Sequence, residues 1–161
     1  MTYPPVLYDG AAEMVGATYR AANTAADFEY PNGTRIDYLA TGASTGGLFG
    51  MYRWQCPPES SGPAPHFHRR ISESFYILTG VVQIYDGERW IDAEPGDWVH
   101  VPPGAVHAFH NREGTAASML LHFSPGAPRE GYFEGLAHLH EMSEAERAAF
   151  YADHDNIWVR T

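Results

Sequence analysis

Residues 66–80 read HFHRRISESFYILTG. His66 and His68 are separated by one residue, Glu73 follows, and the apolar run after it ends at Gly80. Alternate residues of a β-strand project from the same face, so the two imidazoles can converge on one point. The stretch is therefore either a metal site carried by strands or a set of polar residues at the rim of a sheet.

The position of Glu73 favours an interior carboxylate. On a strand it shares a face with Phe75 and Ile77, so it would lie among apolar side chains if that face lines a barrel. A buried carboxylate requires a partner, a metal ion or a proton. Two alternating histidines alone are more often a surface or structural pair, so the choice depends on a second stretch.

The composition favours one soluble domain. A chain of 161 residues fits a single domain, 1–161, that buries enough surface to fold without covalent cross-links. Cys56 is the only cysteine, which excludes an internal disulfide and a multi-cysteine metal cluster. Cys56 itself is expected to be a small buried filler rather than a nucleophile, because no motif surrounds it.

Location and charge exclude several partners. The first residues, MTYPPVLYDG, lack the regions of a signal peptide, and no apolar run is long enough for a membrane span. We therefore expect a cytoplasmic, soluble protein with no membrane partner. The formal net charge is −10 and lysine is absent, so no nucleic-acid partner is expected and lysine Schiff-base chemistry is excluded.

From Thr34 onward, short apolar or alternating runs are separated by Gly, Pro and Asp residues, which predicts strands. Their spacing favours an all-β sandwich or closed barrel with its core at 34–124. Asp86 and Gly87 between two runs predict a hairpin. Residues 1–33 form an N-terminal arm, which could be a short helix or an extended segment.

The pattern becomes helical in the C-terminal segment, 125–161. The stretch YFEGLAHL, 132–139, repeats apolar residues at helical spacing. A second helix is expected at Ser143, where Glu146 completes a capping box. We expect these helices to pack on the outside of the barrel and the final IWVRT to add an edge strand.

A second stretch, GDWVHVPPGAVHAFHN, covers residues 96–111. It places Pro102, Gly104, His107 and Asn111 at fixed offsets from Gly96. The Pro-Pro-Gly turn predicts a chain reversal that returns His107 along a new strand. A third histidine could therefore join the first two.

Together the two stretches resemble the paired motifs of the cupin superfamily, G-x5-H-x-H-x3,4-E-x6-G and G-x5-P-x-G-x2-H-x3-N. The first motif fits from His66 onward, whereas three residues instead of five lie between Gly62 and His66. The second motif fits throughout. The 15 residues between Gly80 and Gly96 match the spacing of small bacterial cupins.

The resemblance implies an all-β double-stranded β-helix, the jelly-roll or cupin barrel, with short C-terminal helices. The metal ligands that it implies are His66, His68, Glu73 and His107. It also implies turns at three glycines and an amide that supports a strand end, namely Gly80, Gly96, Gly104 and Asn111.

One divalent transition metal is the expected cofactor. Three neutral imidazoles and one carboxylate suit Fe, Mn, Ni, Co, Cu or Zn, and the sequence does not choose among them. An octahedral ion would leave two positions open, either for a chelating substrate or for a substrate and O₂.

Residues from about Thr41 to Trp158 further resemble the small cupins related to quercetin 2,3-dioxygenase. This implies a dioxygenase for a small aromatic or enolisable substrate, flavonol- or polyketide-like, with Glu73 as metal ligand and catalytic base. Two alternatives stay open, a non-oxidative isomerase, cyclase or lyase, and a metal-dependent small-molecule-binding protein without turnover. Strand parity makes Phe75, Ile77 and Phe109 candidates for the pocket lining.

The other histidines receive mostly structural interpretations. His100 is expected in a structural hydrogen bond and His110 at the surface or an interface, while His122 is the one histidine expected to support a ligand from behind. Three are expected to be solvated, namely His138, His140 and His154. Because small cupins of this kind often pair through edges or terminal strands, we expect a homodimer built with residues 1–33 and IWVRT.

Overall fold

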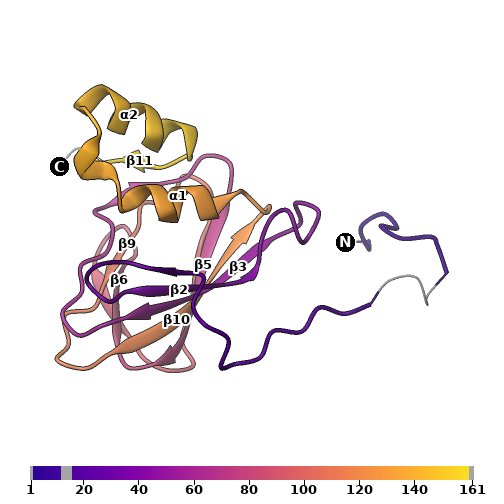
Figure 1. The fold of residues 1–161 in the computed structure, drawn as a ribbon, viewed down its shortest axis with the longest axis horizontal. Coiled ribbons are helices and arrows are strands. Elements are labelled where there is room, and N and C mark those ends of the chain that lie inside the picture. Colours follow the sequence, from indigo (N-terminus) through magenta and orange to yellow (C-terminus); the bar gives the residue numbers. More distant parts are fainter. Residues whose placement is uncertain (1, 12–15, 160–161) are drawn as a thin grey trace.

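A six-stranded antiparallel sheet faces two smaller antiparallel sheets in the computed structural model (Figure 1), which describes residues 2–11 and 16–159. The larger sheet has the strand order β1 (Phe28–Glu29), β2 (Arg35–Ala40), β3 (Gly50–Cys56), β10 (Ala117–Ser124), β5 (Ser72–Thr79) and β8 (Trp98–Val101). The smaller sheets are β7 (Trp90–Ala93), β6 (Val82–Tyr85) and β9 (Ala108–His110), and β11 (Ile157–Trp158) with β4 (His66–Phe67). The predicted all-β jelly-roll architecture is confirmed.

The core lies between the sheets and follows strand alternation. In β3, every second residue from Gly50 to Cys56 is buried, and β10 alternates in the same way. The ring of Trp54 in β3 contacts that of Phe109 in β9 edge to face, with centroids 5.9 Å apart. Side chains from both sheets therefore fill one interior.

Strand β5 carries Glu73 into this interior. Glu73, Phe75 and Ile77 expose 3%, 0% and 1% of their surfaces, which confirms the parity prediction. Since β5 is flanked by β10 and β8, the carboxylate is anchored in the middle of the larger sheet rather than at an edge.

The predicted turns are present. β6 pairs with β7 across the Asp86–Arg89 turn, where Asp86 N donates to Arg89 O at 3.1 Å. The three glycines that the motifs assign to turns have positive φ angles, +67° at Gly80, +98° at Gly96 and +89° at Gly104. These conformations favour glycine, so the motif positions serve the backbone as well as the site.

The N-terminal arm contributes little regular structure. Residues 2–11 and 16–27 contain no helix or strand, and β1 then pairs with β2 at the sheet edge. Arg20 forms ion pairs with Asp27 at 2.9 Å and with Asp37 of β2 at 3.6 Å, and the second of these attaches the arm to the sheet. The part of the arm at 12–15 lies outside the described residues.

The first C-terminal helix does not pack on the outside of the barrel, so that part of the expectation is wrong, whereas the second helix has no buried residue. Helix α1 (Arg129–Leu136) lies across one end of the barrel, followed by a short helical turn, η2 (Leu139–Glu141), and α2 (Glu144–Asp153) (Figure 1). Phe133 of α1 is buried against Tyr52 and Trp54, with ring centroids 5.1 and 5.3 Å away. The apolar face of α1 therefore closes the interior of the barrel at this end.

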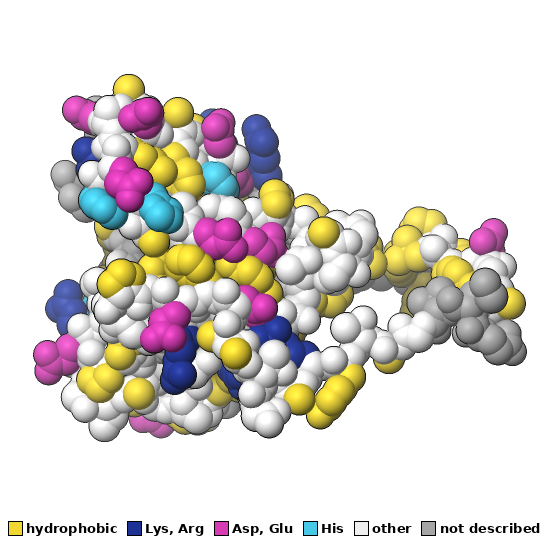
Figure 2. Space-filling model, in the orientation of Figure 1, with side chains coloured by type: hydrophobic (Ala, Val, Ile, Leu, Met, Phe, Trp, Pro, Cys, Tyr) yellow, Lys and Arg dark blue, Asp and Glu magenta, His cyan; other side chains and the backbone are white. Residues whose placement is uncertain are grey.

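Two details of this segment agree with the sequence. Ser143 and Glu146 form the capping box at the start of α2. Ile157 and Trp158 form β11, which pairs with β4 as an edge strand, while Arg160 and Thr161 lie outside the described residues. Acidic side chains gather over the C-terminal helices on the face shown in Figure 2, in keeping with the net charge of −10. Among the described residues, no helix is long and apolar enough to cross a membrane.

Candidate metal centre

Four buried side chains converge inside the barrel. One ligand atom from each of them lies within 4.8 Å of the ligand atoms of the other three, and the four residues are His66, His68, Glu73 and His107. More than thirty residues of the chain separate the first three of them from His107. The structure thus brings together the whole set that the motifs imply.

Backbone pairing places two of the imidazoles side by side. His66 N donates to His107 O at 3.0 Å, and His107 N donates to His66 O at 2.8 Å. The two rings lie with their centroids 4.3 Å apart. This pairing joins the strand of the first motif to that of the second, so neither histidine can move without the other.

Glu73 completes the cluster from strand β5. Its Oε2 atom lies 3.1 Å from Nε2 of His68 and 3.0 Å from Nε2 of His107. His68 follows β4, and its carbonyl oxygen accepts a hydrogen bond from Gly104 N at 2.7 Å, which ties the two motifs together a second time. The carboxylate is therefore held between two imidazoles.

The tautomer of each imidazole follows from its second nitrogen. The Nδ1 atoms of the three histidines face main-chain carbonyl oxygens at 3.0, 2.6 and 3.2 Å, those of Ala64, Asp155 and Ala105 for His66, His68 and His107. A carbonyl only accepts, so Nδ1 carries a proton, and Nε2 then either donates a second proton to Glu73 or, in the neutral ring, offers its lone pair to a cation. Histidines that bind a metal through one ring nitrogen usually donate a hydrogen bond from the other in this way.

The donor set fits a cation. Lone pairs of neutral Nε2 atoms that face an ionised carboxylate repel one another unless a proton or a positive ion lies between them. Three imidazole nitrogens and one carboxylate oxygen suit a divalent transition metal. The four residues could therefore hold such an ion, and their geometry does not select its identity.

Electrostatics support a neutral His66 and an ionised Glu73. Burial, together with the nearby His107, lowers the pKa of His66 to about 3, so this imidazole is neutral at physiological pH. Burial alone would raise the pKa of Glu73, but hydrogen bonds from His107 and His68 offset it and hold that pKa well below its usual range. Glu73 also raises the pKa of His107 against the opposing effect of burial. A metal ion would replace the proton shared by this pair.

Asp155 is a functional residue that sequence reasoning missed. Its carbonyl oxygen orients His68, and its Oδ2 atom accepts from the backbone N–H groups of Arg69 and Arg70 at 3.0 and 2.7 Å. Its φ angle of +55° lies in the left-handed region, which Asp and Asn tolerate better than most residues. The polar run Asp-His-Asp-Asn at 153–156 is the only local signal for Asp155. Its contact with His68 spans 87 residues of the chain, so no local pattern predicts it.

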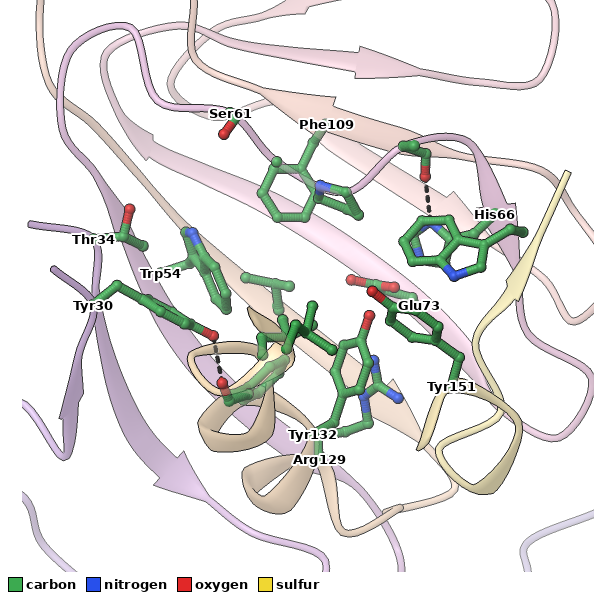
Figure 3. Close-up of a pocket in the computed structure, with 18 of the residues that line it drawn as sticks. Tyr30, Thr34, Trp54, Ser61, His66, Glu73, Phe109, Arg129, Tyr132 and Tyr151 are labelled. Atoms are coloured by element: carbon green, nitrogen blue, oxygen red, sulfur yellow. Dashed lines mark hydrogen bonds between the residues drawn. The ribbon is translucent and has the colours of Figure 1, made fainter. Parts of the chain in front are cut away.

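A cavity of about 370 Å³ opens beside the centre (Figure 3). His66 and Glu73 belong to its wall. Much of the remaining wall is aromatic, formed by Tyr30, Trp54, Phe109, Phe123, Tyr132, Phe133, Tyr151 and Trp158. Helix α1 and strand β11 thus supply part of a pocket that the barrel alone would leave open.

Gly62 lets a loop close against this pocket. A Cβ atom at this position would collide with the carbonyl oxygen of Phe109, so only glycine fits. Gly62 also lies in the cavity wall together with Ser61 and Pro63. The shifted motif glycine therefore has a close-packing role at the entrance loop.

The predictions for the pocket lining are partly wrong. Phe109 lines the cavity, whereas Phe75 and Ile77 are buried in the core outside the wall. The ring of Phe75 lies 6.1 Å from that of His107 and supports it from behind. Strand parity indicates which residues face the interior, but an interior residue can contact packed side chains instead of the cavity.

The histidines outside the centre differ in their surroundings. Ser74 Oγ and His100 Nδ1 form the expected structural hydrogen bond at 2.9 Å, and His110 packs on Trp90. His122 does not support the centre, because strand alternation puts its neighbours Leu121 and Phe123 on the cavity face.

Of the three histidines expected to be solvated, His138 and His140 are exposed, but His154 is not: it is half-buried, and its Nδ1 donates to Phe150 O at 2.8 Å. Cys56 is buried, as expected. Asn111 is fully buried, and its amide donates to the carbonyls of Pro57 and Thr115.

The comparison with protein families agrees with the fold and the candidate site. Residues 52–123 match the family described as "Cupin domain", and both motifs agree with it. The match also agrees with the cupin barrel seen in the fold.

Several known proteins are similar to this chain. Quercetin 2,3-dioxygenase of Bacillus subtilis is 33% identical over 52 residues, which are 32% of this chain and 15% of that protein. The structure of KdgF from Halomonas sp. aligns with a TM-score of 0.61 at 16% identity, covering 72% of this chain and 99% of that one. The polyketide cyclase RemF from Streptomyces resistomycificus aligns with a TM-score of 0.56 at 21% identity, covering 71% and 82%.

These likenesses differ in what they establish. The matches with the two curated relatives, the second an uncharacterized protein of Aquifex aeolicus, span 15% and 50% of those proteins' own lengths. The solved structures are less than 25% identical and share the fold. The reaction and the substrate therefore depend on the chemistry of the site and not on these likenesses.

Proposed function

We propose that this protein is a metal-dependent dioxygenase that acts on a small aromatic or enolisable substrate. The observation that carries the proposal is the convergence of three imidazoles and Glu73 beside a largely aromatic cavity. His66, His68, Glu73 and His107 would hold a divalent ion, which when bound supplies Lewis-acid activation of an enolate or phenolate oxygen and reactivity toward O₂.

The cavity supports binding of a flat, mostly apolar molecule. Its volume of about 370 Å³ lies within the range of small-molecule sites, roughly 300–1,000 Å³. Trp54, Phe109 and Phe133 line it, and the ring of Trp54 packs edge to face on those of the other two. Aromatic walls bind planar substrates by stacking and apolar burial, so they orient the ring while one polar edge reaches Glu73.

Glu73 is the proposed catalytic base. Among the described residues it is the only carboxylate in the cavity wall, and its lowered pKa keeps it ionised. An ionised acid of low pKa is a weak base, but a cation next to the substrate hydroxyl lowers the pKa of that group as well. The proton would pass from the substrate oxygen to Glu73 over a short distance.

The C-terminal segment would exclude water. Leu136, Leu139 and Trp158 from this segment form part of the cavity wall, and α1 lies over the end of the barrel (Figure 1). A closed apolar site strengthens electrostatic interactions and protects a deprotonated substrate from side reactions. The local match to quercetin 2,3-dioxygenase supports oxidation as the fate of that substrate.

A non-oxidative isomerase, cyclase or lyase is the second candidate. The observation in its favour is a second proton-carrying group in the wall, because Tyr132 lies at the cavity together with Glu73. Burial raises the pKa of Tyr132 and keeps the phenol protonated. A base and an acid at one cavity suit proton relocation without O₂.

Oxygen uptake tests the proposal. Purified protein would be loaded in turn with Fe(II), Mn(II), Ni(II), Co(II), Cu(II) and Zn(II) and supplied with flavonols and enolisable aromatics in an oxygen electrode. We expect uptake coupled to substrate loss with at least one redox-active ion and none with Zn(II). Substrate conversion without uptake would establish the second candidate instead, and binding without conversion would indicate a metal-dependent binding protein.

A further inference from the structure

Arg129, the first residue of α1, is a buried cation in the wall of the cavity. Only 3% of its surface is exposed. Its guanidinium stacks on three rings, those of Tyr132 at 4.1 Å, Phe123 at 5.0 Å and Phe133 at 5.6 Å. An arginine at this depth normally has a carboxylate or phosphate partner.

No such partner is present in the described part of the chain. Among residues 2–11 and 16–159, no acidic side chain lies within 4.0 Å of Arg129, and its Nε atom has no hydrogen-bond partner. Nη1 donates to the carbonyl oxygen of His154 at 2.8 Å, which fixes the guanidinium. A buried donor without an acceptor is costly, so the position requires an explanation.

The charge in the cavity has the right sign for an anion. In the described part of the wall, Arg129 is the one arginine and Glu73 the one carboxylate, and there is no lysine. Their charges cancel, and a divalent ion on the ligand set would leave an excess of about +2. An apolar site with that excess favours a substrate that becomes a dianion, such as an enolate or phenolate that also carries a carboxylate.

We propose that Arg129 anchors a substrate carboxylate through its free guanidinium edge, so that the pocket takes aromatic or enolisable carboxylic acids. This inference rests on the proposed function. Arginine suits the task because its planar fork binds a carboxylate through two hydrogen bonds and its face stacks on aromatic rings. The aromatic shell holds the fork in place before the substrate arrives. The carboxylate would fix one end of the molecule while its hydroxyl faces Glu73.

The test uses a matched pair of probes, 3,4-dihydroxybenzoate and 3,4-dihydroxybenzamide. They have the same ring and hydroxyl groups and differ in the charge at the far end. Isothermal titration would measure both against the Zn(II)-loaded protein, in which no oxidation occurs, and against the chelated protein, in which a metal cannot hold the carboxylate. We expect the acid to bind wild type at least about tenfold more tightly than the amide in both states, as for a lost charge-assisted hydrogen bond.

Three variants complete the test. Arg129→Gln should reduce the preference for the acid to about twofold or less and change amide binding little, whereas Arg129→Lys should keep part of the preference. Arg89→Gln removes the same charge from an exposed arginine and should keep the full preference. Circular dichroism and zinc stoichiometry would show that each variant is folded and loaded.

The outcomes are separable. Wild type that binds neither probe, or binds both equally, overturns the anchor, and so does an Arg129→Gln variant that keeps the preference for the acid. If Arg129→Gln does not fold, the wild-type preference and Arg129→Lys decide. A clear preference for the acid in a protein without oxygen uptake would preserve the anchor while rejecting the dioxygenase.

Discussion

The main-chain carbonyl oxygen of Asp155 accepts a hydrogen bond from Nδ1 of His68 at 2.6 Å. The C-terminal segment thus orients a residue of the candidate metal centre as well as closing the barrel. The Asp155 carboxylate reinforces this contact, because it binds the backbone N–H groups of Arg69 and Arg70 just after His68.

Asp155→Ala should weaken metal binding. Loss of the carboxylate frees the loop after His68, and alanine is less stable at φ +55°. Changes to residues that orient a ligand typically cost about 10–100-fold in metal affinity, and we expect that range. Competition with a chromophoric chelator would measure it. Asp155→Asn is the matched control and should stay close to wild type, because asparagine accepts hydrogen bonds and tolerates this φ angle. Unchanged metal affinity in the alanine variant would show that the Asp155 side chain does not help to orient His68.

Glu73→Gln should lower turnover while it preserves the shape of the site. The amide has nearly the same size but no longer accepts a proton as a base, so turnover should fall by about 10²–10⁴ at full metal loading. Initial rates, corrected for metal content by elemental analysis, provide the measurement. Turnover within about twofold of wild type would show that another group accepts the proton.

The sequence predicted the elements whose cause is local. Alternation placed Glu73 in the interior, Asp86-Gly87 specified a hairpin, and Ser143 with Glu146 specified the start of a helix. The four converging residues followed from motif spacing, because strand pairing turns fixed offsets into fixed positions.

The position of α1 and the roles of Arg129 and Asp155 could not be predicted, because they depend on how the C-terminal segment packs back on the barrel. The pattern of α1 shows one apolar face but not which surface that face covers, and it was assigned to the outside. Arg129 and Asp155 take their roles from that packing alone, so neither belongs to a recognisable local pattern. His122 was misjudged because its strand face depends on register. The homodimer stays a prediction.

Gly62→Ala should destabilise the fold. Its Cβ atom would overlap the carbonyl oxygen of Phe109, so the entrance loop or β9 must shift. Overpacking of this kind costs about 1–3 kcal/mol, which corresponds to a fall in melting temperature of roughly 2–12 °C for a chain of this size. Thermal unfolding would measure it. Gly114→Ala is the control, since its Cβ would meet no atom within 4 Å. Equal melting temperatures for both variants would contradict the close packing at Gly62.

Cys56 should be nearly inert in the native protein. Burial raises the pKa of its thiol to about 12, and only the thiolate reacts with disulfide reagents. At pH 8, labelling by a chromogenic disulfide should be at least about 100-fold slower in native protein than in urea. Comparable rates in both states would show an accessible thiol and contradict the assignment of Cys56 as a core residue.

The metal content of three proteins tests the central claim most directly. Elemental analysis would be applied to wild type, His68→Ala and Glu73→Ala after identical reconstitution and removal of free ion. We expect about one divalent ion per chain in wild type, a steep loss in His68→Ala, which removes one of three imidazole donors, and partial retention in Glu73→Ala, in which three imidazoles remain. Equal metal content in all three proteins, or none in any of them, would contradict a metal centre at His66, His68, Glu73 and His107.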